Sequence, residues 1–466
     1  MQATVFSRIR QPIDPLPRRA RARRPIAWVL AGAMLVHVVS PSAWALEGRA
    51  SSVSLPTLLE QALRDNPDLL AARKRWEAAQ AKVPLAKALP APKIGVEWEN
   101  IPRGSLKFNQ AELMYQLIQS LPFPGKLSLR HQVAVKEAQM AAMQFKQAEW
   151  DILSQVKATY YDLFLLDRER EIQQEQVIWL QQATATAQSR YATGAATQAE
   201  VLRLQTELLE ASNALTVLEE RRQAMAAHLN HLLNRPAHDM LGAPEMVGLT
   251  PLDYSVDELT TIATARQPEL LMFQFSAERA EAAWRLSKRE LLPDLETMFE
   301  LRDPAMGPIG PWDLSLALVL PFWFWTKWRY GIRAALYDKE SAQAASQAMR
   351  NEITKRIHEH WHEARAAYST AKLCQDGLIN FSQQVLSSSL AAYQGGRGSY
   401  MEVLDALRML AERRRTYFQH LVAYEQHVVM LEESVGIPLR PNHQVVTSDE
   451  AQVTRQTSKD VTGASK

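Results

Sequence analysis

The sequence predicts a mainly α-helical protein with a small β part, built from two similar halves. Short motifs recur at offsets of 199 to 202 residues. Long stretches lack both glycine and proline, and two pairs of short segments alternate apolar with polar residues. A period of about 200 residues is too long for a solenoid repeat. Each half is therefore expected to be a structural unit of its own.

Four pairs of motifs carry the internal duplication. They are NPDLL at 66–70 and QPELL at 267–271, LPF at 121–123 and 320–322, YATG at 191–194 and YQGG at 393–396, and LNRP at 233–236 and VGIP at 435–438. We therefore expect a first repeat over residues 46–248 and a second over 249–440. The polar segment 441–466 lacks apolar periodicity and is predicted to be a disordered tail.

The first 45 residues have the pattern of a secretory signal peptide. Five arginines between positions 18 and 24 precede an apolar run of 14 residues, and Ala43-Trp44-Ala45 resembles a cleavage site. A retained signal anchor is the alternative, although 14 residues are few for a membrane-spanning helix. Removing residues 1–45 takes seven of 53 Lys and Arg and one of 51 Asp and Glu, which leaves a charge of −4. This balance gives no basic patch that would bind nucleic acid.

Long helices are predicted for most of both halves. Residues 126–193, 195–234 and 332–369 contain neither glycine nor proline, and strong helix formers fill them. Apolar residues, with Arg222 as the one charged member, step by three and four from Val201 to Leu232, which is the a/d seam of a coiled coil. A helix of roughly 65 residues would be about 100 Å long, which is more than a compact domain needs.

Each long helical stretch is expected to fold back at one glycine-containing turn. The two turns are residues 191–197 and 393–399. Gly194 and Gly396 suit the left-handed residue that ends many helices. The sequence therefore predicts two helical hairpins whose tips point in the same direction.

Two pairs of strands are predicted, over residues 93–121 and 294–320. Ile94, Val96 and Trp98 show the alternation, and a loop rich in proline and glycine joins each pair. Each run is about 7–10 residues long, the length of a tilted strand that crosses an outer membrane. A small soluble sheet is the alternative. Four strands in lipid would leave two unpaired edges, so copies of the chain would have to close the sheet, with eight strands from two copies or twelve from three.

The order of these segments resembles the TolC-type outer-membrane efflux proteins over about residues 50–440. The most specific parts are LPFPGK at 121–126 and the pattern Tyr-x-x-Gly-x5-Glu-Val-Leu at both tips. The resemblance implies a homotrimer with a 12-stranded transmembrane β-barrel, four strands per chain, continued by a long α-helical coiled-coil barrel through the periplasm. It also implies contact with outer-membrane lipid, a periplasmic adaptor protein and an inner-membrane pump. We expect no enzymatic activity, no cofactor and no nucleic-acid partner.

The resemblance further implies a periplasmic gate made by acidic side chains just after the second tip. The matching positions are Glu402 and Asp405, which lie three residues apart and so on one helix face. In a trimer, six carboxylates would converge, attract cations and repel one another. An ordinary solvated helix face is the alternative.

Family members brace the closed gate with an acidic residue of the first tip and with a Tyr and an Arg of the second. Glu200 and Tyr393 match the first two positions. The arginine position holds Gly398 in this chain, and the neighbouring Arg397 is the substitute that we consider. By the same resemblance the adaptor would contact the tips at small residues that permit close backbone approach, with a plain turn as the alternative. These positions are Thr193, Gly194, Ala195, Gly395 and Gly396.

Two groups of histidines remain. The stretch His358-Glu359-His360-Trp361-His362 fits the zinc-protease pattern H-E-x-x-H, with His358 and His362 as candidate metal ligands. We favour a lumen-facing or surface histidine cluster over a catalytic zinc ion, because no third ligand is evident. The second group is interpreted as solvated side chains: His228, His231 and His238.

The leading functional hypothesis is the outer-membrane exit duct of a tripartite, RND-type efflux system. The pattern is most similar to family members that serve heavy-metal pumps, so the candidate substrates are small solutes, heavy-metal cations among them. An exit duct for type I protein secretion or for drug efflux is the first alternative. A periplasmic coiled-coil scaffold without a pore is the second.

Overall fold

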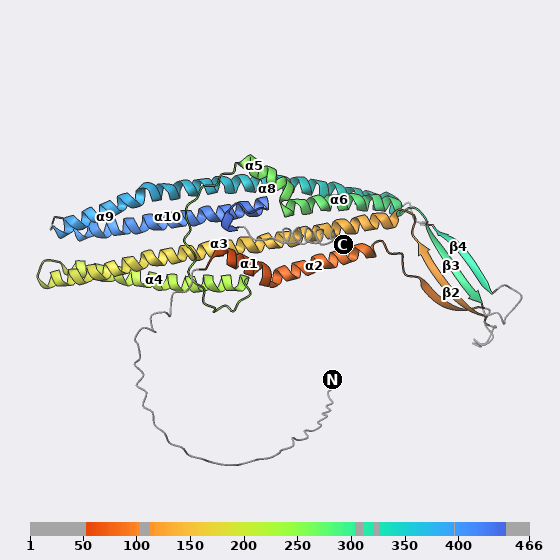
Figure 1. Cartoon of the computed structure of the whole chain (residues 1–466), viewed down its shortest axis with the longest axis horizontal. Coiled ribbons are helices and arrows are strands. Elements are labelled where there is room, and N and C mark those ends of the chain that lie inside the picture. The colour runs from red at the N-terminus through yellow and green to blue at the C-terminus, as the bar shows by residue number, and fades with distance from the viewer. Residues whose placement is uncertain are drawn as a thin grey trace, which may run out of the picture. The chain divides into compact units, whose positions relative to one another are not determined.

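The computed structural model describes residues 53–99, 101, 112–302, 311–320, 326–395 and 397–443. Most of this part of the chain is helical, and its four strands form one sheet (Figure 1). The sheet lies at one end of the long helices, and the tips of two helical hairpins lie together at the other (Figure 1). A mainly α-helical protein with a small β part is thereby confirmed. The predicted signal peptide, 1–45, lies outside the described residues.

The repeated motifs at 66–70 and 267–271 begin a helix in each half. The short helices are α1 (Leu55–Asp65), α2 (Pro67–Leu85), α5 (Val256–Arg266) and α6 (Pro268–Arg289). The Asn66 side chain accepts hydrogen bonds from the N–H groups of Asp68 and Leu69, at 2.9 and 3.3 Å. Gln267 accepts one from the N–H of Leu270 at 2.7 Å. The following proline fits because the first N–H of a helix has no helical partner.

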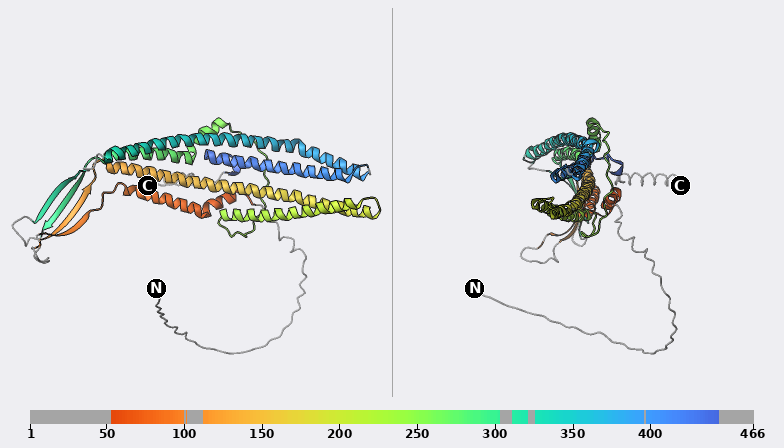
Figure 2. Two further views of the ribbon diagram at one scale, coloured as in Figure 1. Left: turned by 180° about the vertical axis from the view of Figure 1, so that it is seen from behind. Right: turned by 90° about the vertical axis from the view of Figure 1, so that its left-hand side faces the viewer.

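Two helical hairpins lie side by side (Figure 2). The first consists of α3 (Lys126–Ala192) and α4 (Gln198–Leu232), and the second of α8 (Ile332–Leu373), α9 (Ile379–Gln394) and α10 (Tyr400–Val435). Helix α3 has 67 residues, which makes it about 100 Å long. The predicted seam of α4 faces inward, since its buried apolar members include Val201, Leu204, Ala211, Leu229 and Leu232.

The second hairpin differs from the prediction, which had no interruption after residue 332. A π-helical turn, η4 (Cys374–Leu378), separates α8 from α9, and another, η3 (Lys327–Gly331), precedes α8. Each turn contains a glycine, which lowers helix propensity and allows an extra residue in the turn. Helix α3 runs through the equivalent region of the first half without such a turn.

The repeated motifs at 233–236 and 435–438 end the two hairpins. Asn234 and Gly436 occupy equivalent positions, and both have left-handed backbone conformations, with φ of 55° and 77°. The N–H of Gly436 donates to the carbonyl of Glu432 at 2.7 Å. A Cβ atom on Gly436 would lie 3.1 Å from the carbonyl oxygen of Arg266, so this position is tight as well as left-handed.

The sheet is antiparallel with strand order β1-β2-β3-β4. Its strands are β1 (Lys93–Glu99), β2 (Glu112–Leu121), β3 (Asp294–Arg302) and β4 (Trp312–Val319), which lie within the two predicted ranges. The central pairing of β2 with β3 joins the two halves, and places Tyr115 opposite Leu301. Strands β1 and β4 are the two edges.

One face of the sheet is apolar and exposed. Ile94 is 82% exposed and Leu316 is 66% exposed, and the register places apolar residues of all four strands on this face. The opposite face is polar: Gln116 donates hydrogen bonds to Glu97 and to Glu300. In a soluble protein, helices would cover the apolar face of such a sheet, but the apolar side chains of this face are exposed and no described helix covers them. Within the described ranges, no helix is long and apolar enough to cross a membrane.

Polar contacts fix the junction between the sheet and the long helices. Gly125, with φ of 94°, precedes the first residue of α3. Lys126 there donates to the carboxylate of Asp294 at the start of β3, at 2.7 Å. The N–H of Phe123 donates to the same carboxylate oxygen, also at 2.7 Å. These contacts account for the glycine and the lysine of the LPFPGK stretch.

A buried ionic cluster holds the end of the described chain. The ammonium of Lys157 lies 2.7 Å from Glu432, and His443 Nδ1 lies 2.8 Å from the other oxygen of this carboxylate. His443 Nε2 also lies 2.7 Å from the hydroxyl of Tyr161. Burial alone would raise the pKa of Glu432, but Lys157 and His443 outweigh it and hold this pKa below its usual value.

The prediction of a disordered tail over 441–466 is therefore wrong for its first residues. Pro441–His443 form a short 3-10 turn, η5, and His443 is 3% exposed. The polar composition of the segment gave no sign that His443 is buried in the core, where it contacts the buried carboxylate of Glu432. Residues 444–466 lie outside the described part of the chain.

Candidate functional site at the hairpin tips

The first tip is a tight turn of small residues between α3 and α4. Gly194 has φ of 77°, as predicted, and a Cβ atom there would meet nothing within 4 Å. The N–H of Ala195 donates to the carbonyl of Arg190 at 2.8 Å, and the hydroxyl of Thr193 donates to the same carbonyl at 2.9 Å. Thr197 then caps α4 by accepting from the N–H of Glu200. The tip is exposed and open to a partner.

The second tip is built around backbone contacts that leave little room. The N–H groups of Arg397 and Gly398 both donate to the carbonyl of Ala392, at 2.9 and 3.0 Å. A Cβ atom on Gly398 would lie 3.0 Å from the backbone nitrogen of Tyr393. An arginine at 398, the position implied by the family resemblance, would therefore require the turn to shift. Gly396, for which a left-handed conformation was predicted, lies outside the described residues.

The two predicted gate carboxylates lie on the exposed face of α10. Asp405 lies 3.9 Å from the guanidinium of Arg408, which also donates to Glu207 of α4. The hydrogen bond to Glu207 raises the pKa of Arg408, so the guanidinium group stays positively charged. Within the described part of the chain, Glu402 forms no ion pair. Arg408 is a residue that sequence reasoning missed, and it links Asp405 to the first hairpin.

Within one chain, the residues predicted to brace the gate are not linked to one another. No hydrogen bond or ion pair among the described residues connects Glu200, Tyr393 and Arg397. Tyr393 instead stacks under Arg190 of the first hairpin, whose guanidinium carbon lies 5.0 Å from the ring centroid. Arg397 is exposed. The arginine that contacts the tyrosine of the second tip thus comes from the last turn of α3, next to the first tip.

Polar contacts between α10 and the first hairpin continue along its length away from the tips. Arg414 donates to Glu175 at 2.6 Å, and further along Gln419 donates to Glu169 at 3.0 Å. Nearer the tips, an apolar cavity of about 280 Å³ separates the hairpins, with Tyr393 and Tyr400 in its wall. The hairpins are thus joined by ion pairs beside a loosely packed region.

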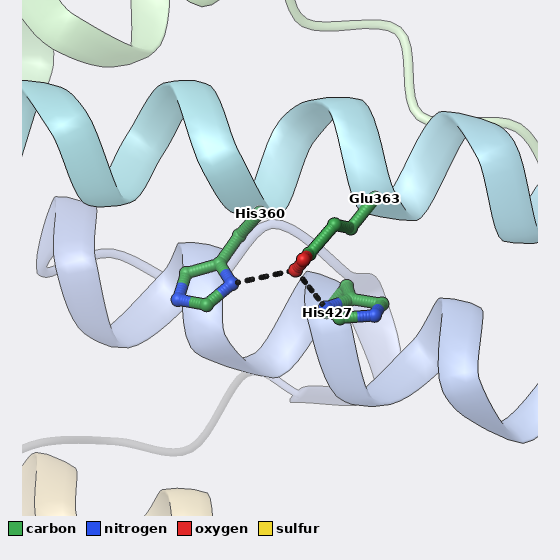
Figure 3. Close-up of side chains that lie close together, drawn as sticks. All are labelled: His360, Glu363 and His427. Atoms are coloured by element: carbon green, nitrogen blue, oxygen red, sulfur yellow. Dashed lines mark ion pairs between the residues drawn. The ribbon is translucent and has the colours of Figure 1, made fainter.

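The zinc-protease pattern is not assembled into a metal site by the fold. His358 and His362 are exposed on α8, with ring centroids 6.5 Å apart. Among the described residues, the group with metal-ligand spacing is His360, Glu363 and His427 (Figure 3). His228, His231 and His238 are all exposed, in agreement with their interpretation as solvated side chains. Sequence analysis missed Glu363 and His427, although the i, i+3 spacing of His360 and Glu363 was a signal.

Comparison with known proteins gives one family match. A family model described as "Outer membrane efflux protein" matches residues 58–235 and again residues 259–437. The two matches fall one in each half, which confirms the internal duplication.

A curated relative is the cobalt-zinc-cadmium resistance protein CzcC of Cupriavidus metallidurans. It is 20% identical over 405 residues, which cover 83% of this chain and 91% of the relative. Among solved structures, CusC matches with a TM-score of 0.73 and 18% identity, covering 84% of this chain and 93% of CusC. The CmeC outer membrane channel of Campylobacter jejuni matches with a TM-score of 0.73 and 13% identity, covering 87% and 89%. The fold described above is the fold of these channels.

Proposed function

Because this chain belongs to the outer membrane efflux protein family, we propose that three copies of it form the exit duct of a tripartite, RND-type efflux system. Family membership itself makes the protein an efflux channel of the outer membrane and not an enzyme. It also favours a channel over a scaffold without a pore. The proposal adds the trimer, the periplasmic adaptor, the inner-membrane pump and heavy-metal cations as substrates.

The observation that carries the proposal is the open sheet with one apolar, exposed face. Among the described strands, the edge strands β1 and β4 are each paired on one side only. Hydrocarbon does not tolerate unpaired backbone groups, so a sheet that enters lipid must be closed by further strands. Other copies of the chain supply them. The apolar face then contacts lipid, and the polar face with Gln116, Glu97 and Glu300 lines the lumen.

A trimer suits a duct better than a dimer. Eight strands from two copies would enclose an interior that side chains fill, whereas twelve from three leave room for solutes to pass. The same symmetry brings three copies of Glu402 and Asp405 around one axis. Their mutual repulsion has to be offset for the gate to close. Arg408, which contacts Asp405 and Glu207, supplies part of that counter-charge.

The exposed tips support contact with an adaptor. Thr193, Gly194 and Ala195 of the first tip are exposed, as is Gly395 of the second. Small side chains let another backbone approach closely. Support for metal cations comes from the relative whose name describes cobalt, zinc and cadmium resistance. An acid gate agrees with a cationic substrate because it concentrates cations.

The test combines assembly with conductance. Membrane-extracted protein should run as a heat-modifiable trimer and, in a planar bilayer, give a small, cation-preferring conductance. The variant Glu402→Ala/Asp405→Ala should conduct more, since the self-repelling constriction is gone. The matched control is Glu219→Ala/Glu220→Ala, exposed acids of α4 away from the tips, which should leave conductance unchanged. A monomer in detergent, or no conductance from either form, would contradict the proposal.

A further inference from the structure

A small group of metal-ligating side chains lies where α8 packs against α10. His360 and Glu363 lie one turn apart on α8, and His427 faces them from α10 (Figure 3). His360 Nδ1 lies 3.5 Å from one carboxylate oxygen of Glu363, and His427 Nδ1 lies 3.2 Å from the same oxygen. The imidazole rings are stacked with centroids 5.9 Å apart. Three potential ligand atoms thus converge from two helices.

We propose that His360, Glu363 and His427 bind one divalent transition-metal ion of the zinc, cobalt or cadmium class. Two imidazoles and one carboxylate are a donor set that suits these ions. Calcium and magnesium prefer oxygen ligands and fit this set poorly. The inference concerns a binding site in the second hairpin and does not depend on the function proposed above.

The spacing of the ligand atoms is close to what such an ion requires. Metal–ligand bonds of about 2.0–2.2 Å in a tetrahedron place neighbouring ligand atoms about 3.3–3.6 Å apart. The two contacts with Glu363, at 3.2 and 3.5 Å, already have this spacing. All three ligand atoms lie within 4.8 Å of one another, so a small rotation of one imidazole completes the triangle. Water can occupy the fourth position because Glu363 is half exposed.

The imidazoles are poorly satisfied by the protein itself. The Nδ1 atoms of His360 and His427 are buried, and although both lie within ion-pair distance of Glu363, neither makes a hydrogen bond with the described residues. Buried polar atoms without a hydrogen bond are rare and point to a ligand or a strained arrangement. The competing interpretation is a pair of histidines that form ion pairs with Glu363 only when protonated.

Metal binding can be measured directly on purified full-length protein that carries no polyhistidine tag. With Co²⁺ as the probe, absorption spectroscopy should show d–d bands, and calorimetry should give one ion per chain. The variant His360→Gln/His427→Gln should lose both signals. The matched control is His358→Gln/His362→Gln, which removes two exposed histidines from the same helix and should leave both signals intact.

A third variant keeps the test decisive if the double variant fails to assemble. Glu363→Gln removes only the charge of the carboxylate and should weaken binding at least 10–100-fold, the loss typical of an outer-shell change. The proposal is overturned if wild-type protein binds no Co²⁺, if binding survives in His360→Gln/His427→Gln, or if the affinity of Glu363→Gln equals that of wild type. It is also overturned if the control variant loses the site. Conductance is measured separately, so a failed duct and a failed metal site give different results.

Discussion

The buried ion pair between Lys157 and Glu432 gives a prediction whose size follows from the structure. Both side chains are 1% exposed, and the charged atoms lie 2.7 Å apart. Replacing Lys157 by methionine preserves most of the volume but leaves the carboxylate buried without its cation. Removing one partner of such a pair costs about 3–5 kcal/mol, because the remaining charge is uncompensated.

This free energy converts into a shift of the melting temperature. The described part of the chain spans residues 53–443. With an unfolding entropy of about 2.1 cal/mol/K per residue, this length gives about 0.8 kcal/mol/K. Lys157→Met should therefore melt about 4–6 °C below wild type in circular dichroism at 222 nm, recorded in one detergent at one scan rate.

Two further variants separate ion-pair loss from a general effect of the substitution. Lys355→Met removes an exposed lysine that pairs with Glu352 at 3.2 Å, and should change stability by less than about 1 kcal/mol. The double variant Lys157→Met/Glu432→Gln removes both charges but keeps an acceptor for the N–H of Leu439. It should regain much of the lost stability, since no charge remains buried. If Lys157→Met has the same melting temperature as the control Lys355→Met, the reasoning is refuted.

Two other predictions concern the same end of α10. Gly436→Ala should lower the free energy of unfolding by more than about 1–2 kcal/mol, which is the cost of placing an alanine in the left-handed conformation. The additional loss is expected because the new Cβ would also crowd the carbonyl oxygen of Arg266. Gly194→Ala, left-handed but in open space, is the control, and equal losses would contradict the packing argument. Burial raises the pKa of Glu425 to about 7 although Arg440 opposes it, so its contribution to stability is lost as pH rises from 4.5 to about 7. Glu425→Gln should therefore gain about 2–3 kcal/mol relative to wild type between pH 5 and 8, and an unchanged difference in melting temperature would contradict this.

Sequence reasoning succeeded wherever a feature depends on a local period. The steps of three and four from Val201 to Leu232 predicted a seam that faces inward, and the alternation beginning at Ile94 predicted strands. The duplication was also visible, because caps such as Asn66 and Gln267 start equivalent helices with similar residues. Each of these signals is formed by residues that lie close to one another in the sequence.

Features that depend on the register between helices could not be predicted. Lys157 and Glu432 stand in helical stretches where charged residues normally face solvent, and only packing shows that they are buried together. His427 lies beside His360 because α8 and α10 pack against each other in one hairpin. The pattern H-E-x-x-H carries no information about this packing. Arg408 reaches Glu207 for the same reason.

The π-helical turn η4 makes the two halves mechanically unequal. In the first half, α3 is a single rod from the sheet to the tip, so it resists bending along its whole length. In the second half, the chain between the sheet and the tip is interrupted at Cys374–Leu378, where a π turn weakens the regular hydrogen-bond ladder. A force applied to both tips would therefore bend the second hairpin at η4, while the first hairpin would move as a rigid body. Glu402 and Asp405 belong to the second hairpin, which is the one that bends.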